Sequence, residues 1–213
     1  MRIVTIETVK LSGRLVRLEL LGPEHIDDLT AAASNERALY QWSPVPCGRD
    51  AVASYIDTAL AWRAAGTAMP FAIIRRKDNV AIGSTRFWNI ERWLWPTDHP
   101  LHGREHPDAC EIGYSWLAST AIRTGANVEA KLLMLEFAFE SWKVLRVCLH
   151  TDQRNERSRR AIEGIGATFE GILRAHRLAA DFTPRQSLRF SILADEWPSI
   201  KERLKQRIHR NTL

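Results

Sequence analysis

The stretch AIRTGANVEAKLLML, residues 121–135, joins a glycine-bearing turn to the start of an apolar helix. A helix N-terminus carries unpaired backbone N–H groups and the positive end of the helix dipole, so a glycine turn leading into it can bind phosphate. The same pattern also fits a buried helix without a ligand. The charges on the helix and the elements around it must decide between the two.

Lys131 is the charge that does not fit this helix. Over residues 127–142, the acids from Glu129 to Glu140 share one stripe, and apolar side chains fill much of the remaining circumference. Lys131 projects away from that stripe, near Asn127 and the positive helix end, where a cation is unfavourable unless an anion is bound. Either Lys131 is solvated where the first turn overhangs a sheet, or it joins Asn127 and the turn amides in holding a phosphate.

A polar loop at residues 96–109 holds a second group of chemically capable side chains. Its histidines and acids are of the types that bind zinc. Three prolines interrupt their spacing and no two are fixed on one helix face, so we predict no metal site. Loops of this length usually carry function.

The elements that position these groups are those of a mixed α/β protein with an antiparallel start. Alternating residues predict strands, and 3.6-residue periodicity with proline, acids or glycine at the ends predicts helices. Gly113 within a strand indicates a bulge or a close backbone approach. The predicted order is strand 14–21, helices 23–34 and 48–66, two strands joined by the polar turn 77–79, strand 110–118, helix 127–142, strand 146–152, helix 155–166, two strands and a closing amphipathic helix.

The composition is that of a single soluble domain spanning residues 1–213, with 45% hydrophobic and 26% charged residues. The first residues lack the apolar run of a signal peptide, and no run reaches membrane-spanning length, so we expect no membrane association. Three cysteines without a CxxC pair favour a reducing, cytoplasmic location. The net charge of +5 favours an anionic ligand without requiring nucleic acid, which we do not expect as a partner.

Three segments in this order, EIGYSWL, RTGANVEAKLLML and HTDQRNERSRRAIEGIGATFEGILR, resemble the GNAT acyltransferases, and among them the RimJ/RimL-like (ribosomal-protein-alanine-type) N-acetyltransferases. The resemblance covers nearly the whole chain, and the combination is more specific than any one segment. It implies an α/β (α+β) fold, with a mixed, mostly antiparallel central sheet, splayed strands and flanking helices. It also implies acetyl-CoA as co-substrate, with no metal.

In this family a strand grips the pantetheine arm and the following turn cradles the pyrophosphate. The residues that match these functions are Trp116, Leu117, Arg123, Thr124, Gly125, Ala126, Asn127, Lys131, Asn155 and Ser158. The turn departs from the family pattern Gln/Arg-x-x-Gly-x-Gly/Ala, because Ile122 and Asn127 stand at its first and last positions. These changes leave the backbone amides of the turn in place, whereas Asn127 adds a larger side chain and a hydrogen-bond donor.

Asn155 matches a residue that hydrogen-bonds the pantetheine arm, and it also suits a helix N-cap; both can be true. Ser158 matches a position that can face the CoA sulfur. Many relatives place a tyrosine nearby as the acid, at the position of Ile162 here, so Ser158 becomes the candidate acid by default. A thiol of pKa about 8.5 leaves readily as thiolate, so the reaction needs little help from a general acid.

The resemblance implies direct attack of an amine on the thioester, with the oxyanion stabilised by backbone N–H groups near Gly113. Glu111 is our first candidate base and His150 the second. The alternatives are a surface carboxylate at a strand start for Glu111 and a packed strand histidine for His150. Such weak bases suit an amine near pKa 8, because a lysine near 10.4 costs roughly 3 kcal/mol more to deprotonate.

We expect the loop 96–109 with Trp88, Trp93, Trp95 and Tyr114 to line the acceptor pocket, with core packing as the alternative for the tryptophans. The acceptor is a protein N-terminus or a small-molecule amine. Rival functions are an acyl-CoA-binding module without turnover, transfer of another acyl group such as succinyl, and RNA docking through the basic closing helix. The resemblance also allows a homodimer.

Overall fold

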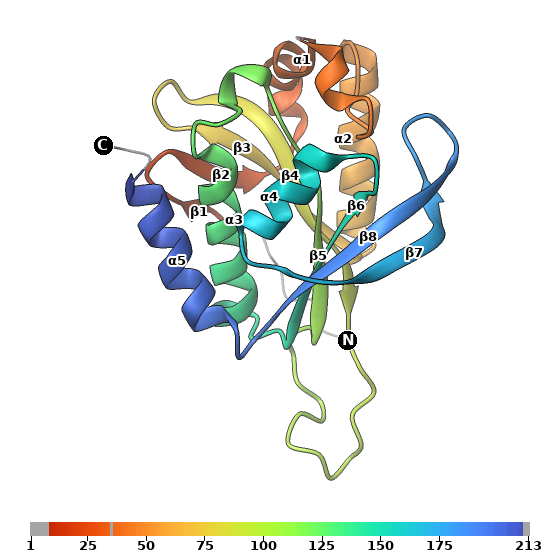
Figure 1. The fold of residues 1–213 in the computed structure, drawn as a ribbon, viewed down its shortest axis with the longest axis vertical. Coiled ribbons are helices and arrows are strands. Elements are labelled where there is room, and N and C mark those ends of the chain that lie inside the picture. The colour runs from red at the N-terminus through yellow and green to blue at the C-terminus, as the bar shows by residue number, and fades with distance from the viewer. Residues whose placement is uncertain (1–8, 35, 211–213) are drawn as a thin grey trace.

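The computed structural model describes residues 9–34 and 36–210 (Figure 1). Within these ranges one mixed sheet has the strand order β1-β2-β3-β4-β5-β6-β8-β7, and every neighbouring pair is antiparallel except β5 with β6. The predicted fold class is therefore confirmed. The strands are β1 Leu11–Ser12, β2 Val16–Leu20, β3 Ala68–Arg75, β4 Val80–Glu91, β5 Ala109–Leu117, β6 Arg146–Asp152, β7 Thr168–Leu178 and β8 Pro184–Leu193.

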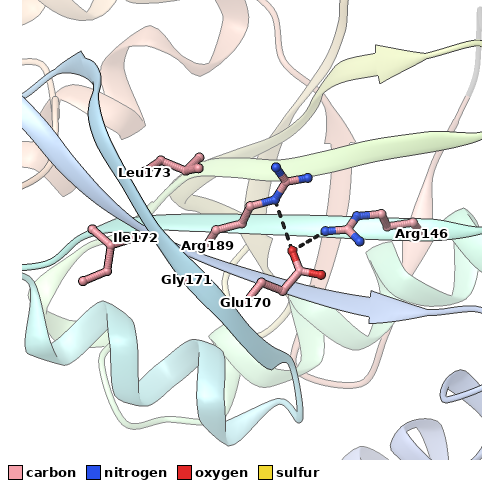
Figure 2. Close-up of a pocket in the computed structure, with 6 residues that line it drawn as sticks. All are labelled: Arg146, Glu170, Gly171, Ile172, Leu173 and Arg189. Atoms are coloured by element: carbon pink, nitrogen blue, oxygen red, sulfur yellow. Dashed lines mark hydrogen bonds and ion pairs between the residues drawn. The ribbon is translucent and has the colours of Figure 1, made fainter.

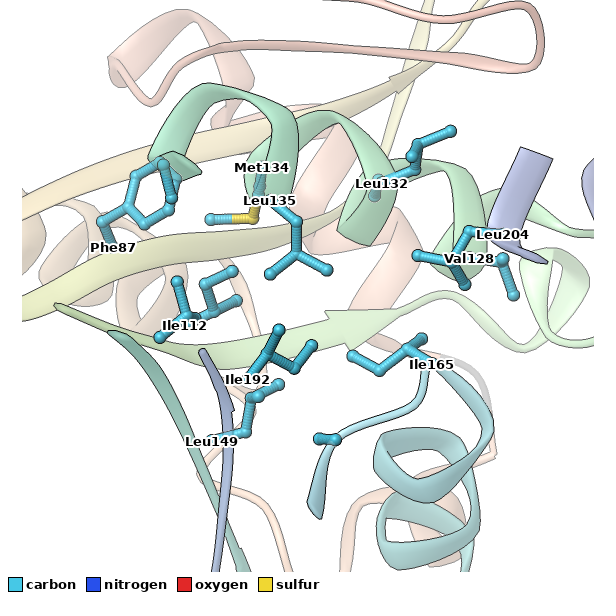
Figure 3. Close-up of a cluster of buried hydrophobic side chains, with 14 of the residues drawn as sticks. Phe87, Ile112, Val128, Leu132, Met134, Leu135, Leu149, Ile165, Ile192 and Leu204 are labelled. Carbon is cyan, nitrogen blue, oxygen red and sulfur yellow. The ribbon is translucent and has the colours of Figure 1, made fainter. Parts of the chain in front are cut away.

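Helices cover both faces of the sheet (Figure 1). They are α1 Ile26–Ser34, α2 Arg49–Ala64, α3 Ala126–Glu136, α4 Glu156–Gly164 and α5 Trp197–Arg210. One core cluster joins α3 and α5 to the sheet, and a second joins α1 and α2 to the opposite face of β3 and β4. Figure 3 shows leucine and methionine side chains of α3 directed at β5 and its neighbours.

Helix α3 differs from the prediction at its C-terminal end, where one π-helical turn at Phe137–Ser141 replaces α-helix. Helix α3 is buried on nearly all sides, and this burial includes Glu129 of the predicted acidic stripe. Gly66 ends α2 with a φ of 71°, the left-handed conformation expected of a C-terminal glycine.

Glu129 does not lie on an exposed acidic stripe, because the β1–β2 turn covers the start of α3. Its carboxylate accepts hydrogen bonds from the backbone N–H groups of Arg14, Leu15 and Val16 at 2.8, 2.6 and 2.7 Å. A Cβ at Gly13 would lie 2.5 Å from Cδ of Glu129, so this close approach requires glycine. Glu129 thus fastens the first two strands to the helix that carries the turn 122–127.

We predict that Glu129→Ala lowers the free energy of unfolding by about 2–4 kcal/mol, because three N–H groups lose their acceptor in a largely buried site. Urea denaturation measures this change. The control is Glu202→Ala, which removes an exposed carboxylate paired with Lys205 at 3.7 Å and should cost less than about 0.5 kcal/mol. Equal losses in the two variants would contradict a fastening role for Glu129.

Candidate active site

The site forms where β5 and β6 part. The two strands pair in parallel over only three residues of each, Ala109 to Glu111 and Arg146 to Cys148. On the other side of β5, Arg86 pairs with Gly113 and Ser84 with Trp116, so Tyr114 and Ser115 together face one residue of β4. This β-bulge follows directly after Gly113, as predicted, and its left-handed residue is Tyr114, with a φ of 51°.

A cavity of about 840 Å³ occupies the space between the diverging strands. It reaches from the turn before α3, past the bulge, to the first residues of α4 and the side chain of Tyr55 on α2. Of the predicted site residues, those that line it are Tyr114, Trp116, Leu117, Arg123, Gly125, Asn127, Lys131, His150, Asn155 and Ser158. Most of the predicted site residues therefore line one continuous cavity, whereas Thr124, Ala126 and Glu111 do not line it.

The turn at residues 122–125 presents a set of backbone donors at one end of the cavity. Arg123 and Gly125 both have left-handed backbone conformations, with φ of 63° and 89°. Within the described part of the chain, the N–H groups of Arg123, Thr124 and Gly125 make no hydrogen bond. The Thr124 hydroxyl instead closes the turn by donating to the Ala121 carbonyl at 2.8 Å. Such a concave group of free N–H donors at a helix N-terminus suits a phosphate.

Lys131 lies elsewhere than predicted. Its side chain is neither solvated nor turned back to the phosphate turn, because α3 packs flat on the sheet and carries Lys131 over the bulge. Its Nζ donates to Oγ of Ser115 at 2.5 Å and to Oγ1 of Thr85 at 3.3 Å, and the residue is 6% exposed. Burial lowers the pKa of Lys131 from 10.5 to about 7.

Glu111 stands at the centre of a charged cluster rather than at the surface. Arg177 of β7 donates to both of its oxygens, at 3.0 and 2.7 Å, and Nδ1 of His150 lies 3.1 Å from Oε2. Burial raises the pKa of Glu111, but hydrogen bonds and charges from His150 and Arg177 outweigh burial and bring that pKa to about 2. A carboxylate of this pKa is a poor proton acceptor at neutral pH, so the geometry disfavours Glu111 as the base.

Asn155 performs the capping function that its position suggested. Its Oδ1 accepts from the N–H of Ser158 at 3.0 Å, and its Nδ2 donates to Oγ of Ser43 at 3.4 Å. Asn155 is thus buried at the start of α4 while lining the cavity. The cap also places Ser158 in the first turn of α4, facing the cavity.

The predicted acceptor residues divide into two groups. Trp88 packs against Trp62 and Tyr114, with ring centroids 5.6 and 5.4 Å apart, beside the cavity. Trp93 and Trp95 lie instead in the loop 92–108, which projects from the bottom of the molecule in Figure 1. Both bond Asp108, which explains their position, and neither lines the cavity. The expected acceptor wall is therefore corrected for these two tryptophans.

Several site residues carried no recognisable sequence signal. Arg86 is 1% exposed, and its guanidinium lies 4.8, 5.2 and 4.3 Å from the rings of Tyr55, Trp62 and Tyr114. Arg177 reaches Glu111 from the distant strand β7.

A smaller hollow lies on the outer strands, away from the site (Figure 2). Its Glu170 is paired with Arg146 and, at 3.1 Å, with Arg189, so both guanidinium groups already have the same carboxylate as partner. Among residues 9–34 and 36–210, no group of three or more histidine, cysteine or acidic side chains could hold a metal ion. No described helix is long and apolar enough to cross a membrane.

Comparison with protein families gives one decisive match. A family model described as acetyltransferase (GNAT) domain matches residues 16–168, most of the chain. The chain belongs to the GNAT acetyltransferase family. Its activity is accordingly acetyl-CoA-dependent N-acetyl transfer, and the free N–H donors at residues 123–125 fit the pyrophosphate of that co-substrate.

Solved structures share the fold of this GNAT enzyme. A GCN5-related N-acetyltransferase from Brucella melitensis is 26% identical, covers 94% of this chain and 86% of its own, and has a TM-score of 0.78. RimJ from Mycobacterium smegmatis, in complex with CoA-disulfide, is 21% identical over 94% and 93%, with a TM-score of 0.73. The ribosomal-protein-S5-alanine acetyltransferase from Vibrio fischeri is 18% identical over 89% and 98%, with a TM-score of 0.65. No curated protein matches the chain significantly.

We predict that Gly125→Ala weakens CoA binding by about tenfold, or roughly 1.4 kcal/mol. A side chain at a φ of 89° is strained, and its Cβ would lie 3.0 Å from Cδ1 of Leu15, so the turn must shift its N–H groups. Calorimetric titration with CoA measures the change. Gly103→Ala is the matched control, because it also has positive φ but lies in the projecting loop with open space around it. Unchanged affinity in Gly125→Ala would contradict the phosphate cradle.

We also predict that Lys131→Met stabilises the GNAT enzyme by roughly 2–4 kcal/mol at pH 6. The buried ammonium costs free energy, and methionine fills the space while Thr85 and Ser115 remain hydrogen-bonded to each other at 2.7 Å. Between pH 7 and 10.5 the unfolded lysine binds more protons than the folded one, so wild-type stability rises with pH and the difference shrinks. Denaturation at several pH values measures it; a difference independent of pH would contradict the lowered pKa.

Proposed function

We propose that the GNAT enzyme transfers the acetyl group directly from acetyl-CoA to a primary amine of low pKa, with the α-amino group of a polypeptide as the preferred acceptor. The observation that carries this proposal is the single cavity that connects the phosphate-binding turn, the bulge and the side chains of Tyr55 and Tyr114. Because thioester and amine can meet in one cavity, the reaction needs no acyl-enzyme.

We expect acetyl-CoA to be bound more by backbone groups than by side chains. The N–H groups of residues 123–125 receive the pyrophosphate, and the edge of β5 at Trp116 and Leu117, which no longer pairs with β6, offers backbone groups to the pantetheine. Asn155 and Ser158 approach from α4. The tight turn at Gly125 and the cap at Asn155 hold these groups before any ligand arrives.

His150 is the group that we propose as proton acceptor, in place of Glu111. Glu111 faces Nδ1 of His150, which directs the proton of the neutral ring to Nδ1 and leaves Nε2 as acceptor. Nε2 is buried and has no hydrogen-bond partner among the described residues. A single imidazole suits an α-amino group near pKa 8 better than a lysine near 10.4.

The structural likeness to an S5-alanine acetyltransferase supports a polypeptide N-terminus as acceptor. Small-molecule amines of similar pKa fit the same chemistry. All three cysteines are free thiols, in agreement with a reducing, cytoplasmic location.

We predict that purified enzyme releases free CoA from acetyl-CoA with an α-amino acceptor, and that His150→Gln lowers kcat/KM by about 10²–10³-fold. Thiol release is followed with an alanine-initiated peptide, the same peptide with a blocked N-terminus, a lysine side-chain peptide and spermidine. Activity should follow the free α-amino group.

Thr58→Ala is the control, because that exposed side chain bonds only within α2. Tight CoA binding without turnover on any amine would favour a binding module over an enzyme. If the His150→Gln variant turns over at the wild-type rate, a group other than His150 accepts the amine proton.

A further inference from the structure

Lys131 is a buried cation without an anionic partner in the described structure. The groups that hold its Nζ are two hydroxyls, Ser115 at 2.5 Å and Thr85 at 3.3 Å. The two hydroxyls also bond each other at 2.7 Å, so Thr85, Ser115 and Lys131 form a closed triangle. If an apolar residue replaced Lys131, Thr85 and Ser115 would still be hydrogen-bonded to each other, so these contacts do not require a cation. The buried charge therefore indicates that Lys131 has another function.

The charged groups around Lys131 leave its ammonium uncompensated. Glu129, on the same helix, is turned to the β1–β2 backbone. Arg86 follows Thr85 on β4 and therefore points to the opposite face of the sheet, among aromatic rings. Tyr114 contacts that arginine, and Glu111 with His150 forms its own cluster. Across α3, Lys201 of α5 pairs with Glu136 and Glu140.

Lys131 lies in the part of the cavity where the reacting atoms are proposed to bind. Lys131 and Ser115 both line the cavity, and Ser115 belongs to the bulge where the edge of β5 becomes free. His150 and Leu149 are successive residues of β6 and point to opposite faces, and Leu149 packs into the core shared with α3. His150 therefore approaches the cavity from the face opposite to α3. A thioester beside the bulge lies between His150 and Lys131.

We infer that Lys131 is the general acid of this enzyme, which donates a proton to the sulfur of CoA as the thioester breaks. This inference rests on the acetyl transfer proposed above. The amine nitrogen forms the new C–N bond, and the C–S bond breaks with its electron pair on sulfur. The amine proton passes to Nε2 of His150, and a proton of Lys131 passes to sulfur directly or through the Ser115 hydroxyl. Solvent then restores both residues.

The energetics agree with this direction of proton transfer. Because burial brings the pKa of Lys131 to about 7, its ammonium is a stronger acid than a thiol near 8.5. An ordinary lysine of pKa 10.5 would hold its proton too firmly. The position where many relatives carry a tyrosine is occupied here by Ile162, which is buried and has no proton to give. Lys131 on α3 provides the proton donor that α4 lacks at Ile162.

The first test titrates the thiol of bound CoA by its ultraviolet thiolate absorbance, and it needs no acceptor. We expect the bound thiol of wild type to titrate together with Lys131 in two coupled steps, whereas the thiol bound to Lys131→Met titrates in one step. Lys131→Arg keeps its charge at every pH of the titration, so its bound thiol should titrate in one step, at a pKa about one unit lower than in Lys131→Met. Identical thiol titration curves in wild type and Lys131→Met, with CoA bound to both, would overturn the inference.

The second test compares rates with the best acceptor of the peptide panel. The ratio of wild-type kcat to Lys131→Met kcat should reach about 10²-fold at pH 6 and fall as pH rises through 7, since only the protonated lysine donates. Ser158→Ala is the matched comparison, and its ratio to wild type should not change with pH. A constant ratio for Lys131→Met would mean a merely structural lysine and would overturn the inference.

Two further outcomes separate this inference from the proposed function. If wild type binds CoA and shows the coupled thiol titration but acetylates no amine, Lys131 still lies at the sulfur and the acceptor proposal fails. If wild type does not bind CoA at all, the proposed function fails and the inference with it. A pH-dependent ratio in Ser158→Ala, with none in Lys131→Met, would assign the acid to Ser158.

Discussion

The parting of β5 from β6 after three paired residues is the constraint on which the rest of the site depends. A continuous sheet would bond the free edge of β5 to its neighbour and leave no backbone groups for a ligand. The bulge at Tyr114 and Ser115 strengthens the divergence by bending β5, while the other edge of β6 pairs with β8 along the whole strand. Helices α3 and α4 then close the gap from one face, with the turn at Gly125 and the cap at Asn155 directed into it.

Charge is distributed across this gap in a way that suits its chemistry. On the face of α2 and β7, Glu111 holds His150 and Arg177 in one cluster. On the face of α3, Lys131 stands alone among hydroxyls. Burial of the Lys131 ammonium costs stability, whereas the partners of Glu111 outweigh its burial, and both groups have a pKa that differs from that in solution. A base on one face and an acid on the other is the arrangement that direct acyl transfer requires.

The sequence predicted the fold and several residues of the cavity lining because those features are local. Periodicity set the strands and helices, Gly113 marked the bulge, and the Gly125 turn and Asn155 cap follow from backbone preferences of single residues. The contacts that changed the interpretation connect distant parts of the chain. Glu129 meets residues 14–16, and Arg177 meets Glu111, 66 positions away. The sequence marks Lys131 as a cation on an otherwise apolar side of the helix, but helical spacing alone does not show whether its side chain points to the turn or to Ser115.

The central claim is that the thioester lies at the bulge, between His150 and Lys131. A crystal structure of the enzyme with CoA tests it most directly. The account predicts the pyrophosphate on the N–H groups of residues 123–125, and the sulfur within hydrogen-bonding distance of Nζ of Lys131 or Oγ of Ser115. A sulfur placed beyond the reach of both groups, with the pyrophosphate bound as expected, would contradict it.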